Sequence, residues 1–118
     1  MLSSRTARTN LSAKEPCRPI AAAIAGWVSS REAFAQDGAG QAYEEMGRAD
    51  DAADFYRTAA ATHRDLNDRW NLAQTLHHLG RASGDTDAWR QARDLLTNFD
   101  DPRATALRQL LTEALRDR

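Results

Sequence analysis

The amino-acid sequence predicts an all-α fold of stacked antiparallel helix hairpins that ends in a C-terminal capping helix. The first observation is composition: 23 of the 118 residues are alanine and 12 are leucine, whereas Ile20, Ile24 and Val28 are the only β-branched aliphatic residues. Alanine and leucine favour helices, and β-branched residues favour strands. The second observation is an internal repeat with a period of 33 residues. A chain of this length has room for one small domain with a modest core.

The N-terminal residues differ in composition from the rest of the chain. Residues 1–19 are rich in serine, threonine and arginine, contain Pro16 and Pro19, and show no helical spacing of apolar residues. Such a segment buries too little apolar surface to fold, so we expect it to be disordered. Residues 20–35 are predicted to form an N-terminal helix that packs on the repeats.

The N-terminal region also permits an alternative interpretation as a secretory signal. The apolar run "IAAAIAGWV" precedes "AFA", which has the small-x-small form of a signal-peptidase site. Arg31 and Glu32 lie between the two, and the run is only weakly hydrophobic. We therefore expect a cytoplasmic protein and keep export through residues 1–35 as the alternative. The run is too short to cross a membrane, which takes about 20 apolar residues.

A repeat domain is predicted over residues 36–116. A shift of 33 positions superposes Gly47-Arg48-Ala49 on Gly80-Arg81-Ala82. Further matches are Gln41 with Gln74, Asp54 with Asp87, Tyr56 with Trp89, Arg57 with Arg90, Ala59 with Ala92, Leu66 with Phe99 and Asp68 with Asp101. Such a period in a helical chain indicates stacked helix hairpins, each too small to bury its apolar face alone.

The second repeat unit contains the signals of two helices. Asp68 is placed to cap the first, and Gly80 and Gly84 then permit a turn. The apolar stripe of this first helix comprises Leu72, Leu76 and Leu79. An N-cap for the second helix is offered by Asp85, Thr86 or Asp87, and its inward residues are Ala88, Ala92, Leu95 and Leu96.

The first unit and the C-terminal segment follow the same logic. Gly47 to Asp50 is the predicted turn of the first unit. The inward residues expected on its two helices are Ala39, Tyr43 and Met46, and then Ala52, Phe55, Tyr56, Ala59 and Ala60. In the C-terminal segment, Asp100 or Asp101 caps a helix with Pro102 at its first position. Its apolar stripe of Leu107, Leu111 and Ala114 or Leu115 is expected to shield the end of the stack.

The motifs in these units resemble the tetratricopeptide repeat family. "AGQAYEEMGRADDAADFYRTA" supplies the small, aromatic and glycine positions of the family at its spacing, and "LAQTLHHLGRASGDTDAWRQA" supplies most of them. The second unit departs from the pattern at Asp85, where the family has a small residue. The resemblance implies a helical solenoid that binds a peptide or protein through its concave face.

The amino-acid sequences of the second unit and of the segment "NFDDPRATALRQLL" resemble more narrowly the repeat tails of large bacterial regulators. These are antibiotic-regulatory transcription activators and STAND-type ATPases of high-GC bacteria. The ratio of 15 arginines to one lysine in this chain fits the coding bias of high-GC genomes. The resemblance implies a scaffold role in bacterial signalling or transcription regulation. Two alternatives stay open: a fragment of a larger regulator with no function beyond folding or self-association, and an exported helical protein. A homo-oligomer formed through an uncapped end is a further expectation.

The sequence holds no pattern of catalytic or metal-binding residues. His77 and His78 are consecutive on a helix, so they point about 100° apart and do not chelate one metal together. His63 lies near a helix end, where a cation suits the helix dipole. We expect no enzyme, no cofactor and no metal. With a net charge of −1, we also expect no direct nucleic-acid binding and no membrane partner.

The candidate partner-binding residues are the outward positions of the first helix in each unit, which line the groove if the resemblance holds. They are Gln41, Glu44, Glu45, Trp70, Gln74, His77 and His78, with Phe34 and Asp37 beside them. Their mixed character suits a polar or basic peptide with some aromatic stacking, and the imidazoles suggest binding that changes near pH 6.5. The structural alternative is that Trp70 and Phe34 fill the core between units.

Overall fold

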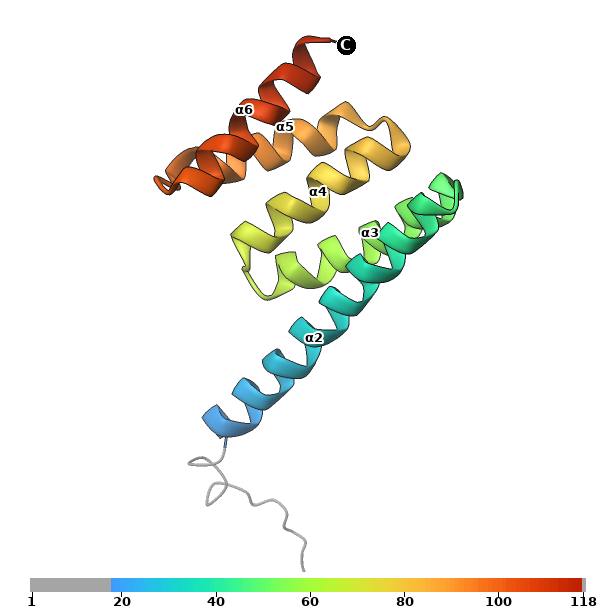
Figure 1. Cartoon of the computed structure of the whole chain (residues 1–118). Helices are drawn as coiled ribbons and strands as arrows, with labels where there is room; N and C mark the ends of the chain where they lie inside the picture. The colour runs from blue at the N-terminus through green and yellow to red at the C-terminus, as the bar shows by residue number, and fades with distance from the viewer. Residues whose placement is uncertain (1–17, 118) are drawn as a thin grey trace, which may run out of the picture.

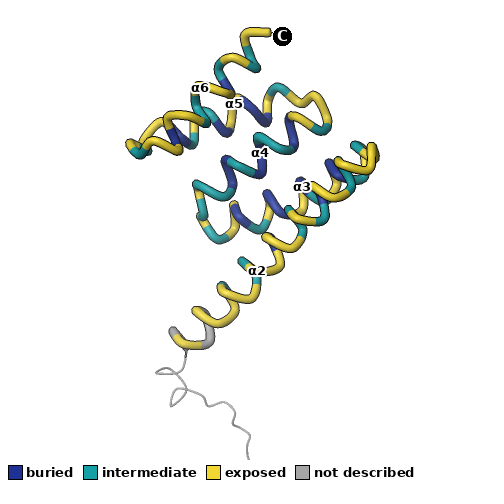
Figure 2. The backbone as a smooth tube through the Cα atoms, in the orientation of Figure 1, coloured by how far each residue is buried: buried dark blue, intermediate teal, exposed yellow. Residues whose placement is uncertain are grey.

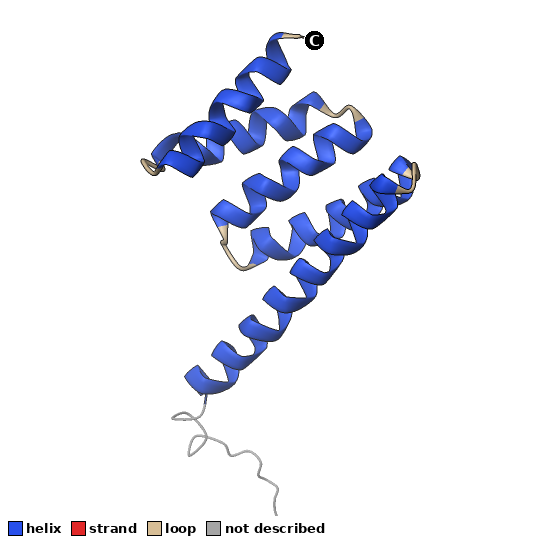
Figure 3. Cartoon of the chain, in the orientation of Figure 1, coloured by secondary structure: helices blue, strands red, loops and turns tan. Residues whose placement is uncertain are grey.

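The computed structural model describes residues 18–117, all of whose regular structure is helical (Figures 1 and 3). The elements are α2 (Arg18–Glu45), α3 (Ala49–Asp65), α4 (Arg69–Ser83), α5 (Thr86–Leu95), the short 3-10 helix η2 (Leu96–Asn98) and α6 (Pro102–Arg116). The predicted all-α class is confirmed for this part of the chain. The disorder expected for residues 1–19 lies outside the described residues, except that the last two of them begin α2.

Each helix packs mainly on the helices that precede and follow it in sequence, and successive helices run in opposite directions (Figure 1). The resulting body is elongated, with extents of 68 × 34 × 19 Å. A chain folded in this way makes mostly local contacts, so the position of each helix depends on its immediate neighbours.

Helix α2 continues through the boundary that the sequence analysis placed between residues 35 and 36. Its 28 residues form one helix because no proline follows Pro19 within it, and Gly26, Gly38 and Gly40 are tolerated inside the helix. The C-terminal half of α2 packs on α3, and the N-terminal half is largely exposed (Figure 2). The expected packing of residues 20–35 on the repeats is therefore limited to the residues nearest α3, such as the buried Ala33.

Three aspartates begin helices as predicted. Asp68 accepts a hydrogen bond from the backbone N–H of Asn71 at 3.3 Å, and Asp85 accepts one from Asp87 at 3.0 Å. Asp101 accepts one from Ala104 at 2.8 Å, and Pro102 occupies the first turn of α6. Each aspartate satisfies an N–H group that the helix itself leaves without a partner, which stabilises the fold by about 1 kcal/mol per cap.

The glycines have different roles from one another. Gly47 and Gly84 adopt φ of 81° and 75°, the left-handed region in which glycine alone is unstrained, and they end α2 and α4. Gly80, which we expected to help form a turn, instead lies inside α4. A Cβ atom there would collide with the indole ring of Trp89. Close packing, not the turn, therefore requires a glycine at position 80.

The core follows the apolar stripes with one clear exception. The buried hydrophobic cluster includes Ala52, Tyr56, Leu72, Leu76, Leu79, Ala88, Trp89, Ala92, Leu96 and Leu111. Met46, expected to face inward, is 61% exposed, because α2 ends at Glu45 and Met46 belongs to the turn. Arg108 adds a contact that the sequence did not suggest, since its guanidinium donates to the carbonyls of Leu96 at 2.5 Å and Phe99 at 2.7 Å.

Candidate functional site

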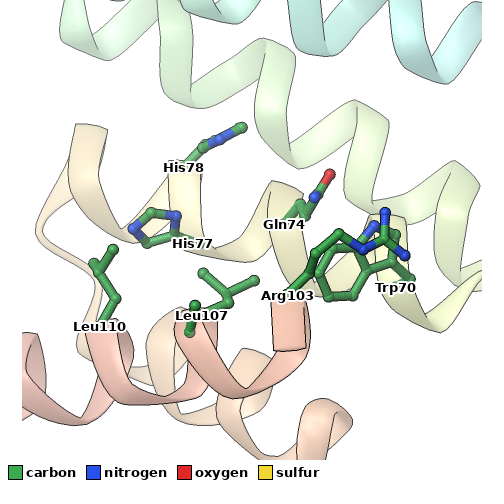
Figure 4. A pocket seen from close by; sticks show the side chains of 8 residues that line it. Trp70, Gln74, His77, His78, Arg103, Leu107 and Leu110 are labelled. Atoms are coloured by element: carbon green, nitrogen blue, oxygen red, sulfur yellow. The ribbon is translucent and has the colours of Figure 1, made fainter. Parts of the chain in front are cut away.

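A groove of about 450 Å³ lies between α4 and α6. We call it the α4–α6 groove; it is lined by Trp70, Gln74, His77, His78, Arg103, Ala106, Leu107 and Leu110. Figure 4 shows His77 near Leu107 and Leu110 of α6 and Trp70 near Arg103, whereas the side chains of Gln74 and His78 extend away from α6 in this view. All four candidate residues that the sequence analysis placed on α4 line this groove. Its α6 wall was missed, because the sequence analysis considered that helix only as a cap.

Trp70 forms one end of the groove. The guanidinium of Arg103 lies over its ring at 4.8 Å, and the ring of Phe99 lies 6.1 Å away on a tilted plane. Trp70 is half-buried and packs against the core cluster. It therefore fills the space between helices and also offers an edge to the groove, so the two alternatives considered for this residue coexist. Arg103 is the cation at this end, held in place by the aromatic ring.

The two histidines point to different sides of α4. Figure 4 shows His77 directed at Leu107 and Leu110, whereas His78 is directed away from α6. The ring of His78 lies 5.4 Å from that of Tyr56 on α3. Burial lowers the pKa of His77 to about 4, and burial also lowers the pKa of His78. His77 therefore titrates well below the pH 6.5 expected from the sequence, the pKa of His78 is also below 6.5, and both imidazoles are neutral at physiological pH.

Glu44 belongs to a cluster that joins three helices. Its carboxylate accepts two hydrogen bonds from Arg81 of α4, at 2.7 and 2.8 Å, and one from the hydroxyl of Tyr56 of α3 at 2.8 Å. We call these three residues the glutamate cluster. The hydrogen bonds from Arg81 lower the pKa of Glu44, while burial and the adjacent carboxylate raise the pKa of Tyr56. Glu44 is partly buried, and its carboxylate is already engaged by Arg81 and Tyr56.

A second cluster lies seven residues earlier along α2. Asp37 accepts hydrogen bonds from the hydroxyl of Thr75 at 2.8 and 2.9 Å, and its carboxylate lies 3.3 Å from Nε2 of His63. His63 and Thr75 are completely buried, and Phe34 packs edge-on against the imidazole at 5.6 Å. We call Asp37, His63 and Thr75 the aspartate cluster. His63 lies in the last turn of α3, as expected from the sequence, and it is also completely buried.

The aspartate cluster lacks the geometry of a catalytic triad. The hydroxyl of Thr75 donates to the carboxylate and not to the imidazole, so the histidine is not placed to remove its proton. His63 and Thr75 are completely buried, and Asp37 is mostly buried. Over residues 18–117, no group of three or more His, Cys, Asp or Glu side chains is arranged to hold a metal ion.

The candidate residues on α2 do not join those on α4. Gln41 and Glu45 are exposed on α2 outside the α4–α6 groove, and Glu44 belongs to the glutamate cluster. The structure therefore divides the sequence-based site into an α4 part that lines a groove and an α2 part that does not. The signal that the sequence analysis missed is the seven-residue spacing shared by Asp37 and Glu44 on α2 and by Tyr56 and His63 on α3. That spacing brings each pair to one face of its helix.

Comparison with known proteins leaves the family open. No protein-family model, curated protein or solved structure matches this chain. The resemblance to tetratricopeptide repeats therefore rests on the sequence motifs alone. Within the described residues no helix combines the length and apolar character needed to cross a membrane.

Proposed function

We propose that this chain is a protein-interaction module of the tetratricopeptide type that binds a peptide or protein segment in the α4–α6 groove. The observation that carries the proposal is the groove itself, in which four residues selected from the sequence as partner contacts meet an apolar wall from α6. Grooves that combine apolar side chains with a few polar groups are the usual form of a recognition site.

The chemistry of the groove defines the partner more narrowly than the sequence did. Leu107 and Leu110 offer apolar contact, Gln74 and the neutral His77 offer hydrogen bonds, and Arg103 offers a positive charge. No carboxylate lines the groove, and Glu44 lies outside it in the glutamate cluster. We therefore replace the basic peptide suggested by the sequence with a segment that carries a bulky apolar side chain followed by an acidic group.

The cellular setting is proposed from the motifs. A cytoplasmic scaffold without catalysis or cofactor, acting in bacterial signalling or transcription regulation, fits the resemblance to the repeat tails of bacterial regulators. The fragment of a larger regulator and the exported helical protein are the alternatives. The groove favours the binding role over the fragment, because a segment that only folds has no need of an apolar hollow beside exposed Leu110, which is 49% exposed.

The binding proposal is tested with a displayed library of random peptides panned on the immobilised wild-type chain. Enriched peptides are then synthesised with a fluorescent label and titrated by fluorescence polarisation. A Gln74→Ala/His77→Ala variant is expected to weaken binding by at least about tenfold, since contacts at the centre of an interface dominate its free energy. Enriched peptides are expected to share an apolar residue near an acidic one.

The matched control is a Gln41→Ala/Glu45→Ala variant, in which Gln41 is the repeat equivalent of Gln74. It removes polar groups from α2, outside the groove, and should bind the peptides as the wild type does. Equal loss of affinity in both variants, or no loss in either, would show that the α4–α6 groove is not the binding site.

A further inference from the structure

Helix α2 carries a row of exposed large apolar side chains between residues 20 and 34, the last of which, Phe34, also packs edge-on against His63 of α3. The members of this row are Ile20, Ile24, Trp27, Val28 and Phe34, which are 63%, 58%, 62%, 45% and 50% exposed. We call this set the apolar stripe. Large hydrophobic side chains seldom gather at such exposure on a monomer without a binding role.

The spacing of the apolar stripe is that of a helix-pairing seam. Ile20, Ile24, Trp27 and Phe34, together with Arg31, follow one another at intervals of four, three, four and three residues. With about 3.6 residues per turn, these positions fall within about one third of the helix circumference. Arg31 extends over the ring of Trp27, 4.9 Å from its centre, so its aliphatic stem continues the seam while its charge reaches solvent.

The side of α2 that faces the rest of the protein is a different one. Gly26 lies nearest to Leu66 at the end of α3, and Ala33 and Gly40 are buried on the same side. Helical geometry places these positions on roughly the opposite side from the apolar stripe. The exposed parts of the apolar stripe are therefore accessible without any movement of α3.

We propose that the apolar stripe is the contact surface between two copies of this chain, paired through antiparallel α2 helices. The two ends of the stripe are equally far from Trp27, because Ile20 and Phe34 stand seven residues before and after it. An antiparallel pair related by a two-fold axis at Trp27 thus sets Ile20 of each copy beside Phe34 of the other. Such a self-complementary surface is the requirement for a closed dimer.

The lack of charged side chains along this part of α2 favours a second copy of the chain as its partner. The stretch of α2 from residue 19 to residue 30 has no ionisable side chain, and Arg31 is followed at once by Glu32. Residues 19–30 of two copies therefore meet without repulsion between like charges. Alanine at position 23, which borders the apolar stripe, keeps the helix narrow there and permits close approach of two backbones.

The size of the apolar stripe indicates a reversible dimer. A buried aromatic side chain removes about 150–250 Å² from water and an aliphatic one somewhat less, so half-exposed members offer roughly 400 Å² per copy. Two copies would bury roughly 800 Å², which is below the roughly 1,200–2,000 Å² of stable complexes. We therefore expect association in the micromolar range and a monomer on dilution.

The experiment is sedimentation equilibrium of the full chain over a range of concentrations. The wild type is expected to approach twice the monomer mass as concentration rises. Ile24→Glu should stay monomeric at every concentration, and the milder Ile24→Ala should weaken dimerisation by about tenfold without placing a charge on the helix. Met46→Glu is the matched control, because Met46 is 61% exposed at the other end of α2, and should dimerise normally. Circular dichroism checks that every variant keeps its helix content.

The orientation is tested by disulfide formation in a Cys17→Ser background. Chains with Ile20→Cys and chains with Phe34→Cys should cross-link to one another when mixed, and far less to themselves. Self-cross-linking of Ile20→Cys alone would overturn the antiparallel arrangement. A wild type that stays monomeric at all concentrations, or an Ile24→Glu variant that still dimerises, overturns the proposal. Binding of a monomeric wild type to phospholipid vesicles would assign the apolar stripe to a lipid surface instead.

Discussion

The two sides of α4 differ in how their polar side chains are used. Toward α2 and α3, Thr75 and Arg81 are engaged in the aspartate and glutamate clusters. Toward α6, Gln74 and His77 face a groove with leucines opposite. The difference arises because α2 supplies two carboxylates at the right spacing, whereas α6 supplies an arginine and apolar residues. Helix α4 thus makes a polar contact with α2 and α3, which we call its closed side. It lines an apolar groove with α6, which we call its open side.

This difference separates residues that stabilise the fold from residues that are free to bind. The polar atoms at the contact between α4 and α2 already form hydrogen bonds within the protein. Replacing those bonds by hydrogen bonds to a ligand would contribute little free energy of binding. The polar atoms that line the α4–α6 groove have no such commitment to α6. Substitutions on the closed side should therefore change the free energy of unfolding, and substitutions on the open side should change binding.

The largest effect is expected from Tyr56→Ala, on the closed side. Tyr56 is completely buried, packs over Gly40 and donates to Glu44. Its truncation leaves a cavity and should lower the free energy of unfolding by about 3–5 kcal/mol, measured by urea denaturation. Tyr43→Ala is the control, since Tyr43 is only partly buried and should cost clearly less. Equal losses would mean that Tyr56 does not anchor α3 to α2.

A smaller loss is expected from Asp37→Ala. Removing the carboxylate leaves the hydroxyl of Thr75 and the imidazole of His63 buried without their partner, which should cost about 1–3 kcal/mol. Thermal unfolding of the variant beside Asp54→Ala provides the comparison, because Asp54 is 78% exposed and makes only an intrahelical ion pair. A stability loss no greater than that of Asp54→Ala would contradict the role given to the aspartate cluster.

Gly80→Ala tests the close contact between α4 and α5. Alanine is a better helix former than glycine, yet its Cβ would collide with Trp89, so we expect a net loss of about 1–2 kcal/mol. At Gly38 the same substitution meets no neighbouring atom within 4 Å and should raise stability by about 0.5–1 kcal/mol. Chemical denaturation of the two variants should therefore give changes of opposite sign, and changes of the same sign would disprove the assignment.

The smallest expected effect is the contribution of His77, on the side of α4 that faces α6, to the pH dependence of the free energy of unfolding. Burial lowers the pKa of His77 from 6.5 to about 4 in the folded protein. Below pH 6.5 the unfolded chain therefore binds more protons at this residue than the folded one, so the free energy of unfolding falls as the pH is lowered from 6.5 toward 4. The loss should be about 1 kcal/mol near pH 5.5. His77→Gln should flatten this part of the pH profile, and an unchanged slope would show that His77 does not contribute.

The seven-residue spacings illustrate what a single sequence reveals and what it hides. The stripe of Leu72, Leu76 and Leu79 predicts a buried face, and the structure confirms it. The pairs Asp37 with Glu44 and Tyr56 with His63 carry the same kind of regularity, yet polar residues at such spacing usually mark a solvated face. Nothing within either helix indicates that the two polar faces meet, so both clusters were missed.

The sequence by itself determined the helical class and the aspartate caps, because each depends on residues within one or two turns. Asp68 and Asp101 cap the next helix in any arrangement of the chain. The tertiary structure alone decided which polar residues became interior: Arg81 reaches Glu44 across 37 residues and Thr75 reaches Asp37 across 38. Such pairs depend on how helices cross, and the crossing is set by the packing of many side chains together.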